Sequence, residues 1–495
     1  MNKLKFTALV LIFVIVLCQL LISCGDNTKS ETSNSDNGVV NNANDDANDE
    51  DNSTVSEDLY AYPEHNFNGA VINILSRKDG WADGSQDFDD LYVESEIGEV
   101  LNDAVYRRNR VVEEKYNVEI KVTHVDDPNN IILRSVRAGD DEYQLMQEKL
   151  IFMSATLATQ GFLYDLKNVE SLNLDAPWYN QNAIKDLSIN NKVTTLGGDI
   201  AVSDKSGVIM AVFNKKMVVD YGIENLYETV RQGKWTLDKL YELMIQTAVD
   251  LNGDGRMTIQ DDQWGLVCED YAGWMFSVAS GNRLANLNEN GLPYMTTITE
   301  KAVNDHEKIK MVLYEQTARV GTGDSAEYER VFTENRSLFA IGMLSQFTAI
   351  RAMENDFGII PLPKQDENQQ NYVTTISPWV SRFIAMPTTC GNPEMVGAVV
   401  DAMSRESTNT VVPAYYDNLL NQKIARDEES VEMLKQIFAS VIYDIGSVFN
   451  WGDIWNLQYQ FINGANQDYV GFHERYEGRI ESALANTIEA MQQFD

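Results

Sequence analysis

Short apolar runs alternate along most of the chain with longer stretches that carry apolar residues at helical spacing. The runs AVINIL (70–75) and VEIKV (118–122) predict strands, and the stretch EVLNDAVYRRNRVVEEKYN (99–117) between them predicts an amphipathic helix. A strand, a helix and a second strand in this order place two parallel strands in one sheet, with the helix across one face. The pattern therefore predicts an α/β fold.

The same alternation continues towards the C-terminus. Strands are predicted at 207–213, 263–267, 337–343 and 357–363, and helices at 236–249 and 393–405. Thr236 is a suitable N-cap for the first of these helices, because its hydroxyl can accept a backbone N–H of the first turn. The part of the chain with this pattern, about 430 residues, is too long for one core, so two or more lobes are expected.

The N-terminal part of the chain has a different pattern. Lys3 and Lys5 precede an apolar run that ends at Ile22, which is typical of a secretory signal peptide; an uncleaved membrane anchor is the alternative. From Gly25 to about residue 62 the chain consists largely of Asn, Asp, Ser and Glu. Because such a segment has too little apolar surface to offset the entropy lost on ordering, it predicts a disordered tether.

The net charge of the chain indicates which classes of ligand it can bind. The formal net charge is −36, and most of it lies outside the tether. A body this acidic repels phosphate backbones and anionic lipid, which argues against nucleic acid and favours a neutral or cationic ligand.

Beyond the signal and tether only Cys268 and Cys390 remain, so we expect no disulfide framework and two free, mostly buried thiols.

Several phrases, taken in order, resemble the extracellular solute-binding proteins of the maltose-binding-protein type (family 1), the receptors of ABC importers. They are AGDDEYQL (138–145), APWYNQNAIKDLSINNK (176–192), LGGDIAVSDKSGVIMAVFNKK (196–216), GKWTLDKL (233–240) and FGIIPLPK (357–364). Gln144 stands where Asp is usual in the first phrase. The phrase LISC (21–24) resembles a lipobox, which implies that Cys24 becomes the lipidated first residue of the mature chain.

The resemblance implies a two-lobed periplasmic-binding-protein-like (type II) fold, each lobe a mainly parallel sheet flanked by helices, closing on a ligand. It divides the chain into a signal peptide (1–23), a lipidated Cys with the tether (24–62), lobe 1 (63–203 and 373–408) and lobe 2 (204–372 and 409–495). It also implies a monomer without catalytic activity, lipid-anchored at the extracellular face of the cell membrane. This monomer would pass a solute, with carbohydrate as the expected class, to the transmembrane subunits of an ABC permease.

The segment DLNGDGRMTIQDD (250–262) has the spacing of a calcium loop. The oxygen ligands would come from Asp250, Asn252, Asp254, the backbone carbonyl of Arg256, Thr258 and Asp261. Gly255 falls where such a loop turns sharply. A strand follows instead of a second helix, so we interpret the Ca²⁺ as a structural ion. A loop of Asx turns without metal is the alternative.

Aromatic residues are the main candidates for ligand contact, because a flat ring stacks on the C–H face of a sugar. Trp178 and Trp379 each follow a Pro in a loop-like phrase near a predicted lobe junction, and Trp81 and Trp274 come next. Asp199, Asp204 and Arg77 are assigned to hydroxyl groups of the ligand, with solvated carboxylates as the alternative for the two acids. Trp235 and Trp264, beside helix and strand ends, are interpreted as structural.

Two other functions remain open at this stage. A secreted carbohydrate-active enzyme would also be acidic and rich in Trp, with two carboxylates across its cleft. The chain has no G-x-S-x-G motif, no phosphate-binding Gly loop and no Cys/His pair in motif context, and the family phrases favour a binding protein over an enzyme. A glycan-binding or sensory surface protein without a permease has the same sequence features as a transport receptor.

Overall fold

The computed structural model describes residues 63–78, 89–269, 271–314, 317–320, 325–421, 424–457 and 468–493. The signal peptide, Cys24, the tether and Trp81 lie outside the described residues. Within the described ranges, no helix is both long enough and apolar enough to pass through a membrane.

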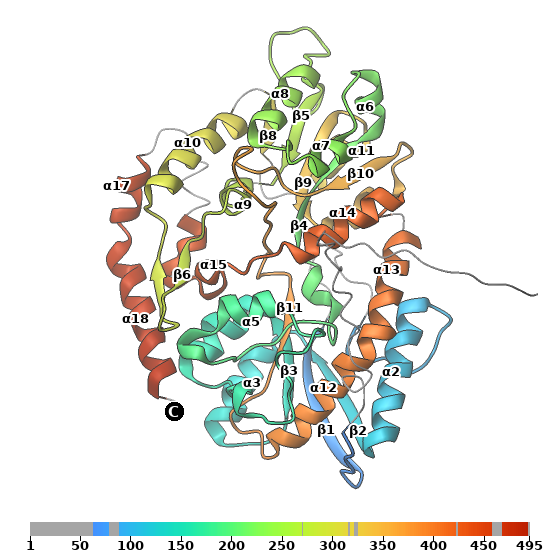
Figure 1. Cartoon of the computed structure of the whole chain (residues 1–495), viewed down its shortest axis with the longest axis vertical. Coiled ribbons are helices and arrows are strands. Elements are labelled where there is room, and N and C mark those ends of the chain that lie inside the picture. Colours follow the sequence, from blue (N-terminus) through green and yellow to red (C-terminus); the bar gives the residue numbers. More distant parts are fainter. Residues whose placement is uncertain are drawn as a thin grey trace, which may run out of the picture. The chain divides into compact units, whose positions relative to one another are not determined.

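Lobe 1 is built on a four-stranded mixed sheet with the strand order β11-β3-β1-β2 (Figure 1). Its strands are β1 (Ala70–Arg77), β2 (Val118–Val125), β3 (Leu145–Lys149) and β11 (Arg382–Ala385). β1 pairs in parallel with β2 and β3, and β11 pairs antiparallel with β3. The strand–helix–strand prediction for the start of the body is therefore confirmed.

The helices of lobe 1 follow the predicted periodicity. They are α2 (Val100–Tyr116), α3 (Pro128–Ala138), α4 (Leu150–Phe152), α5 (Gln181–Leu187) and α12 (Pro393–Asn409), with the short helices η2 (Met153–Leu157), η3 (Ala158–Gln160), η4 (Leu166–Asn168) and η5 (Ile189–Asn191). α2 buries Leu101, Val105 and Val112 on one face and packs against α12. α3 packs on β1 and β3, so helices cover the sheet as the α/β pattern requires.

Lobe 2 is built on a five-stranded mixed sheet with the order β10-β4-β9-β5-β8. Its strands are β4 (Ile209–Asn214), β5 (Trp264–Cys268), β8 (Ala318–Val320), β9 (Ser337–Met343) and β10 (Phe357–Ile360). β5 is parallel to β8 and β9, whereas β4 is antiparallel to β9 and β10. A separate hairpin pairs β6 (Ala285–Leu287) with β7 (Pro293–Met295).

Helices surround the second sheet, and one of them, α8 (Leu237–Thr247), is the helix predicted at 236–249. They are α6 (Lys215–Asp220), α7 (Leu226–Arg231), α8 (Leu237–Thr247), α9 (Ala272–Ala279), α10 (Glu300–Tyr314), α11 (Ser325–Thr333), η7 (Gln346–Ala352) and α14 (Glu428–Ala439). Thr236 caps α8, with its side chain accepting the N–H of Lys239, as expected. Trp235 is fully buried and donates to the carbonyl of Pro361 (2.8 Å), and Trp264 is buried in β5, so their structural role is confirmed.

Three of the chain crossings between the lobes lie side by side. The first runs through η6 (Val202–Lys205) into β4, the second precedes β11 and the third follows α14. Ile209 N–H donates to Thr375 O (3.1 Å), and Thr374 N–H donates to Ser440 O (3.2 Å). The crossings therefore form one hydrogen-bonded hinge.

The C-terminal segment corrects one expected boundary. Residues 409–495 were assigned to lobe 2, yet α13 (Val411–Asn421) packs on α2 and α12 of lobe 1. After the third crossing come α15 (Ile445–Phe449), η8 (Trp451–Asp453), α17 (Tyr469–Glu474) and α18 (Glu477–Gln493). α18 contacts η3 and η5 of lobe 1 as well as β7. The lobe against which these helices pack depends on tertiary contacts rather than on local sequence.

Cys268 and Cys390 are both buried and neither forms a disulfide, as predicted. Cys268 ends β5 of lobe 2. Cys390 follows β11 of lobe 1, and burial raises the pKa of its thiol to about 11.

Candidate ligand-binding site

The ends of the strands indicate where a ligand would bind. In an open α/β sheet, ligands bind outside the carboxyl ends of the parallel strands. In lobe 1, β1 and β3 end with Arg77, Glu148 and Lys149, and the antiparallel β11 begins beside them with Arg382. In lobe 2, Glu269 directly follows β5, and Gln346 comes soon after β9.

Five aromatic side chains connect these two strand edges. Phe152 lies 5.6 Å from Trp379, Trp379 lies 6.2 Å from Trp455, and Trp455 lies 6.1 Å from Trp274 and 5.7 Å from Tyr271, all between ring centroids. We call these five residues the aromatic cluster. Phe152 and Trp379 adjoin β3 and β11 of lobe 1, Tyr271 and Trp274 follow β5 of lobe 2, and Trp455 belongs to the C-terminal segment. The cluster therefore bridges the lobes.

The indole N–H groups of this cluster lack partners. Nε1 of Trp274, Trp379 and Trp455 is buried and finds no hydrogen-bond acceptor among the described residues. More than nine in ten buried polar groups in native proteins have a partner, because an unsatisfied donor costs about 1–3 kcal/mol. Three such donors in one cluster mark a place where an acceptor from outside the chain would be stabilising.

Arg77 lies at this edge, and each of its three guanidinium nitrogens already donates a hydrogen bond within the protein. Its Nε and one terminal nitrogen bind the two carboxylate oxygens of Glu148, which is fully buried, and the other terminal nitrogen donates to Asp126 O. Its guanidinium carbon lies 5.2 Å from the ring centroid of Phe152. Arg77 therefore supports the aromatic cluster, and its predicted hydrogen bond to a ligand hydroxyl would have to compete with these contacts.

Trp178 is a correction to the sequence-based site. It is 0% exposed, its Nε1 donates to Asp401 Oδ1 (3.1 Å), and the guanidinium carbon of Arg405 lies 4.9 Å from its ring centroid. Asp401 and Arg405 belong to α12 and also pair with each other at 2.7 Å. With its ring enclosed and its N–H satisfied, Trp178 offers no surface to a ligand in this structure and belongs to the core of lobe 1.

Asp199 and Asp204 lie in or just before the first crossing, with partners of their own. Asp199 Oδ2 accepts from Thr408 (2.9 Å), and Asp204 Oδ1 accepts from Lys205 (2.9 Å). Burial raises the pKa of both carboxyls, that of Asp204 to about 6. These contacts place both carboxylates in the hinge, where Asp204 is buried and Asp199 is half-buried, and none of them involves the aromatic cluster.

Sequence reasoning missed five residues of this region. Trp455, Phe152 and Tyr271 of the aromatic cluster received no role from the sequence, nor did Glu148 and Glu269 at the strand edges. Glu269 is buried, and its carboxylate accepts the side-chain amide of Gln346, whose own oxygen accepts Met343 N–H (2.8 Å). An acid directly after a fully apolar strand was the available signal, because that position is the carboxyl end of the strand.

The loop expected to bind calcium is held by its own hydrogen bonds. Asp250 accepts the N–H groups of Gly253 (2.7 Å) and Gly255 (2.8 Å), and Asp254 accepts that of Arg256 (2.8 Å). Among the described residues, no three His, Cys, Asp or Glu side chains converge as metal ligands. The carboxylates predicted as ligands are thus not gathered in this conformation, which has the Asx turns of the alternative interpretation.

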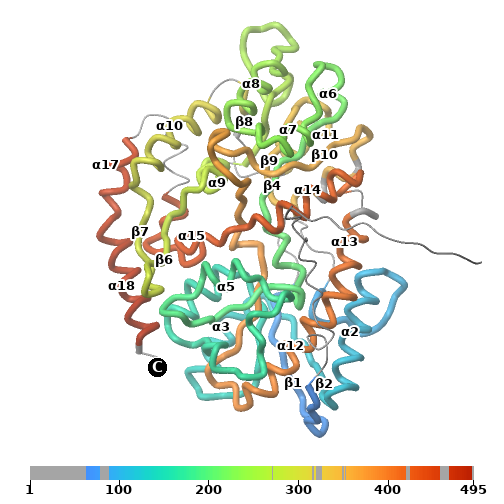
Figure 2. The backbone as a smooth tube through the Cα atoms, in the orientation of Figure 1, coloured from blue at the N-terminus to red at the C-terminus, as the bar shows by residue number. Residues whose placement is uncertain are grey.

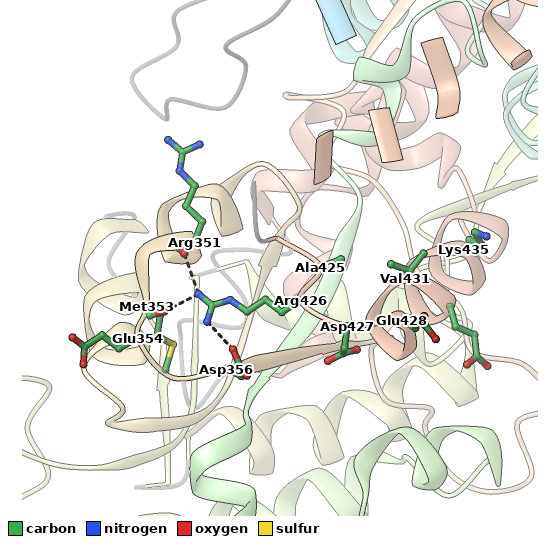
Figure 3. A pocket seen from close by; sticks show the side chains of 11 residues that line it. Arg351, Met353, Glu354, Asp356, Ala425, Arg426, Asp427, Glu428, Val431 and Lys435 are labelled. Carbon is green, nitrogen blue, oxygen red and sulfur yellow. Dashed lines mark hydrogen bonds and ion pairs between the residues drawn. The ribbon is translucent and has the colours of Figure 1, made fainter. Parts of the chain in front are cut away.

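A wide pocket of about 1050 Å³ lies elsewhere, on lobe 2, where the start of α14 meets the turn before β10 (Figure 3). Arg426 reaches across it and donates to Arg351 O (3.0 Å), Met353 O (2.7 Å) and Asp356 Oδ1 (3.2 Å). Its guanidinium thereby fastens two segments of lobe 2 to each other. We assign this pocket a structural role.

Comparison with known proteins supports the fold. No family model matches the chain, and no curated protein sequence matches it. Its fold is similar to that of a cyclo/maltodextrin-binding protein solved with maltotetraose, with a TM-score of 0.55, 14% identity, and coverage of 85% of this chain and 96% of the other.

Two further solved structures are similar over the same region. RafE of Streptococcus pneumoniae has a TM-score of 0.52 at 13% identity, covering 86% of this chain and 98% of its own. The ABC substrate-binding protein Lmo0181 of Listeria monocytogenes, solved with cycloalternan, has a TM-score of 0.51 at 12% identity, covering 86% and 99%. The chain has the two-lobed periplasmic-binding-protein-like fold. Within that class, the expected fold of the maltose-binding-protein type is confirmed.

Proposed function

We propose that this protein is an extracellular receptor that captures a carbohydrate between its two lobes and delivers it to an ABC importer. The observation that carries the proposal is the aromatic cluster, which is built from both lobes and holds three buried indole N–H groups without an acceptor. A sugar offers what such a cluster lacks, because its C–H faces pack on aromatic rings while its oxygens accept hydrogen bonds. The proteins of similar fold include binders of maltotetraose and cycloalternan, which supports this ligand class.

Carboxylates from both lobes complete the proposed site. Glu269 at the end of β5 and Glu148 at the end of β3 lie at the edges where a ligand would meet the sheets. A ligand that contacts both edges favours the closed arrangement of the lobes, since those contacts exist only when the edges approach each other.

The enzyme alternative receives little support from these acids. Both carboxylate oxygens of Glu148 already accept hydrogen bonds from Arg77, through Nε and one terminal nitrogen. Catalysis therefore forms no part of the proposal.

The anchoring of the receptor is also a proposal. Cys24 would carry the lipid, the acidic segment to about residue 62 would serve as a tether, and the body would face the outside of the cell membrane. The structural Ca²⁺ in the loop 250–261 remains part of this proposal. The carboxylates of that loop would have to turn from their own backbone towards the ion.

The experiment is a titration of the purified protein with a panel of neutral mono- and oligosaccharides, followed by intrinsic Trp fluorescence. Saturable changes in emission with at least one saccharide are expected, because three tryptophans belong to the aromatic cluster. Chromatography of each mixture after prolonged incubation tests the enzyme alternative at the same time. Shorter products from a bound saccharide would favour that alternative, and a flat emission with every saccharide would contradict the proposed ligand class.

A further inference from the structure

The C-terminal segment touches both lobes after the last crossing. We call its described part, residues 445–457 and 468–493, the C-terminal strap. α15 contacts β6 of lobe 2 and also α4 and η2 of lobe 1. α18 contacts β7 on one side and η3 and η5 of lobe 1 on the other, and Figure 2 shows it running alongside the β6–β7 hairpin.

The two helices at the end of the strap are fixed to different lobes. On α17, the Tyr469 hydroxyl donates to Thr297 O (3.0 Å), and its ring stacks on His306 of α10 at 4.6 Å with an interplanar angle of 28°. α18 begins three residues after α17 ends and reaches lobe 1. A joint this short gives the helix pair little length to extend if the lobes move apart.

The face that α18 buries explains why it stays in place. Ile480, Thr487 and Met491 recur at helical spacing and are each at most 4% exposed. Thr487 accepts the indole N–H of Trp451 (2.9 Å). Gly452 passes so close to the helix that a Cβ there would lie 2.8 Å from the Cα of Ile480. Tight packing of this kind, rather than helix propensity, holds α18 against the earlier part of the strap around η8.

The β6–β7 hairpin makes a second link on the same flank. Its turn carbonyl, Gly291 O, accepts the N–H of Asn190 in η5 of lobe 1 (2.8 Å). Asn190 and Asn191 both have left-handed backbone, with φ of 52° and 60°, which few side chains tolerate as well as Asn does. Arg283, just before β6, pairs with Asp186 of α5 at 3.0 Å. The hairpin thus belongs to lobe 2 in sequence and contacts lobe 1 in space.

From these contacts we infer that the strap and hairpin limit how far the lobes separate, so that the ligand enters and leaves from the flank opposite to the strap. Trp455 lies between the anchors of the strap and contacts both Trp379 of lobe 1 and Trp274 of lobe 2. A ligand bound at the aromatic cluster and the position of the strap are therefore coupled. The inference rests on the proposed function only in naming that ligand site; the limit on opening does not depend on it.

The test measures lobe separation in the ligand-free protein by fluorescence energy transfer. Dyes are placed on Val111→Cys in α2 of lobe 1 and Val219→Cys in α6 of lobe 2, which are 43% and 78% exposed. The thiols of Cys268 and Cys390 are buried and should stay unlabelled. Met491→Glu places a charge on the buried face of α18. As a control, Asn486→Glu places the same charge on its exposed face.

With Met491→Glu, hydrogen exchange should show α18 released, and the distance between the dyes should become longer and more broadly distributed. Asn486→Glu should match the parent. A chain ending at Tyr476, which lacks α18, serves as the second variant if Met491→Glu does not fold or keeps α18 in place. Unchanged distances in a folded variant whose α18 is released or absent would overturn the inference. Because no ligand is present, this outcome is independent of the saccharide titration.

Discussion

Trp379 and Trp455 lie 6.2 Å apart between ring centroids, although the first adjoins the sheet of lobe 1 and the second belongs to the C-terminal strap. Each ring also contacts a second member of the aromatic cluster, Phe152 for Trp379 and Trp274 for Trp455. The pair therefore exists only while lobe 1 and the strap are together, and through Trp274 it continues to lobe 2.

The first prediction concerns this pair. Trp379→Ala and Trp455→Ala should each weaken the binding of the best saccharide by roughly tenfold to hundredfold, because each loses buried ring surface at the centre of the site. Calorimetric titration gives the affinities, and circular dichroism checks that both variants fold. If both folded variants bind the saccharide as tightly as the parent, the ligand does not bind at the aromatic cluster.

Trp178→Phe should lower the stability of the protein and leave its saccharide affinity nearly unchanged. The variant loses the hydrogen bond to Asp401 and part of the stacking with Arg405, which together cost about 1–3 kcal/mol in the free energy of unfolding. Urea unfolding should show this loss, while saccharide affinity stays within about twofold of the parent. A large loss of saccharide affinity without a loss of stability would show that Trp178 contacts the ligand.

Trp178 and Trp379 show what local sequence can and cannot predict. Both follow a Pro, in APW and SPW, and both were placed in the cleft. The partner that encloses Trp178 is Asp401, which is 223 residues away in sequence, so nothing near Trp178 indicates its burial. Trp379 remains at the strand edge because it comes just before β11.

The fold was more predictable than the site because strand and helix periodicity is local. The strand predicted at 337–343 has the same bounds in the structure, and the helices predicted at 99–117 and 236–249 differ by one or two residues at each end. The lobe that receives α13 or α18 depends on tertiary contacts that no local pattern encodes. Glu269 is an intermediate case. Its position directly after a buried strand is a local signal that could have identified it as a candidate site residue.

A pH dependence of stability is expected from Asp444. Burial raises its pKa from 3.8 to about 6, although its Oδ1 accepts the backbone N–H groups of Leu284, Ala285 and Gly446. Between these two pH values the unfolded chain has lost the proton and the folded chain still holds it. Folding therefore takes up a proton there, and the stability contributed by this group falls as pH rises through about 6.

Asp444→Asn keeps the accepting oxygen and removes the buried charge. Its free energy of unfolding should exceed that of the parent by up to about 3 kcal/mol above about pH 7 and least near pH 4, as measured by urea unfolding. Asp366→Asn is the control of opposite sign. Burial would raise the pKa of Asp366, but the N–H groups of Asn368 and Gln369 outweigh it and lower the pKa. A difference between Asp444→Asn and the parent that does not change with pH would contradict the assignment.

The calcium loop gives a prediction for metal removal. If Ca²⁺ binds at Asp250, Asn252, Asp254, Arg256, Thr258 and Asp261, saturation at about 100 times its Kd stabilises the fold by about 2.7 kcal/mol. Chelation should then lower the Tm, and Asp254→Ala should remove this response. Asp366→Ala, which alters an Asx turn outside the loop, should retain it. Identical melting curves with and without chelator would leave the loop as a set of Asx turns.

The most direct test of the central claim is hydrogen exchange of the protein with and without the saccharide that binds best. Protection is expected together in segments of both lobes and the strap, namely 148–152, 269–274, 378–382 and 454–457, because the ligand would lie against all of them at once. The segments around the pocket at Arg426 and the loop 250–261 should exchange as before. Protection confined to one lobe, or centred on Arg426, would contradict a ligand held between the lobes at the aromatic cluster.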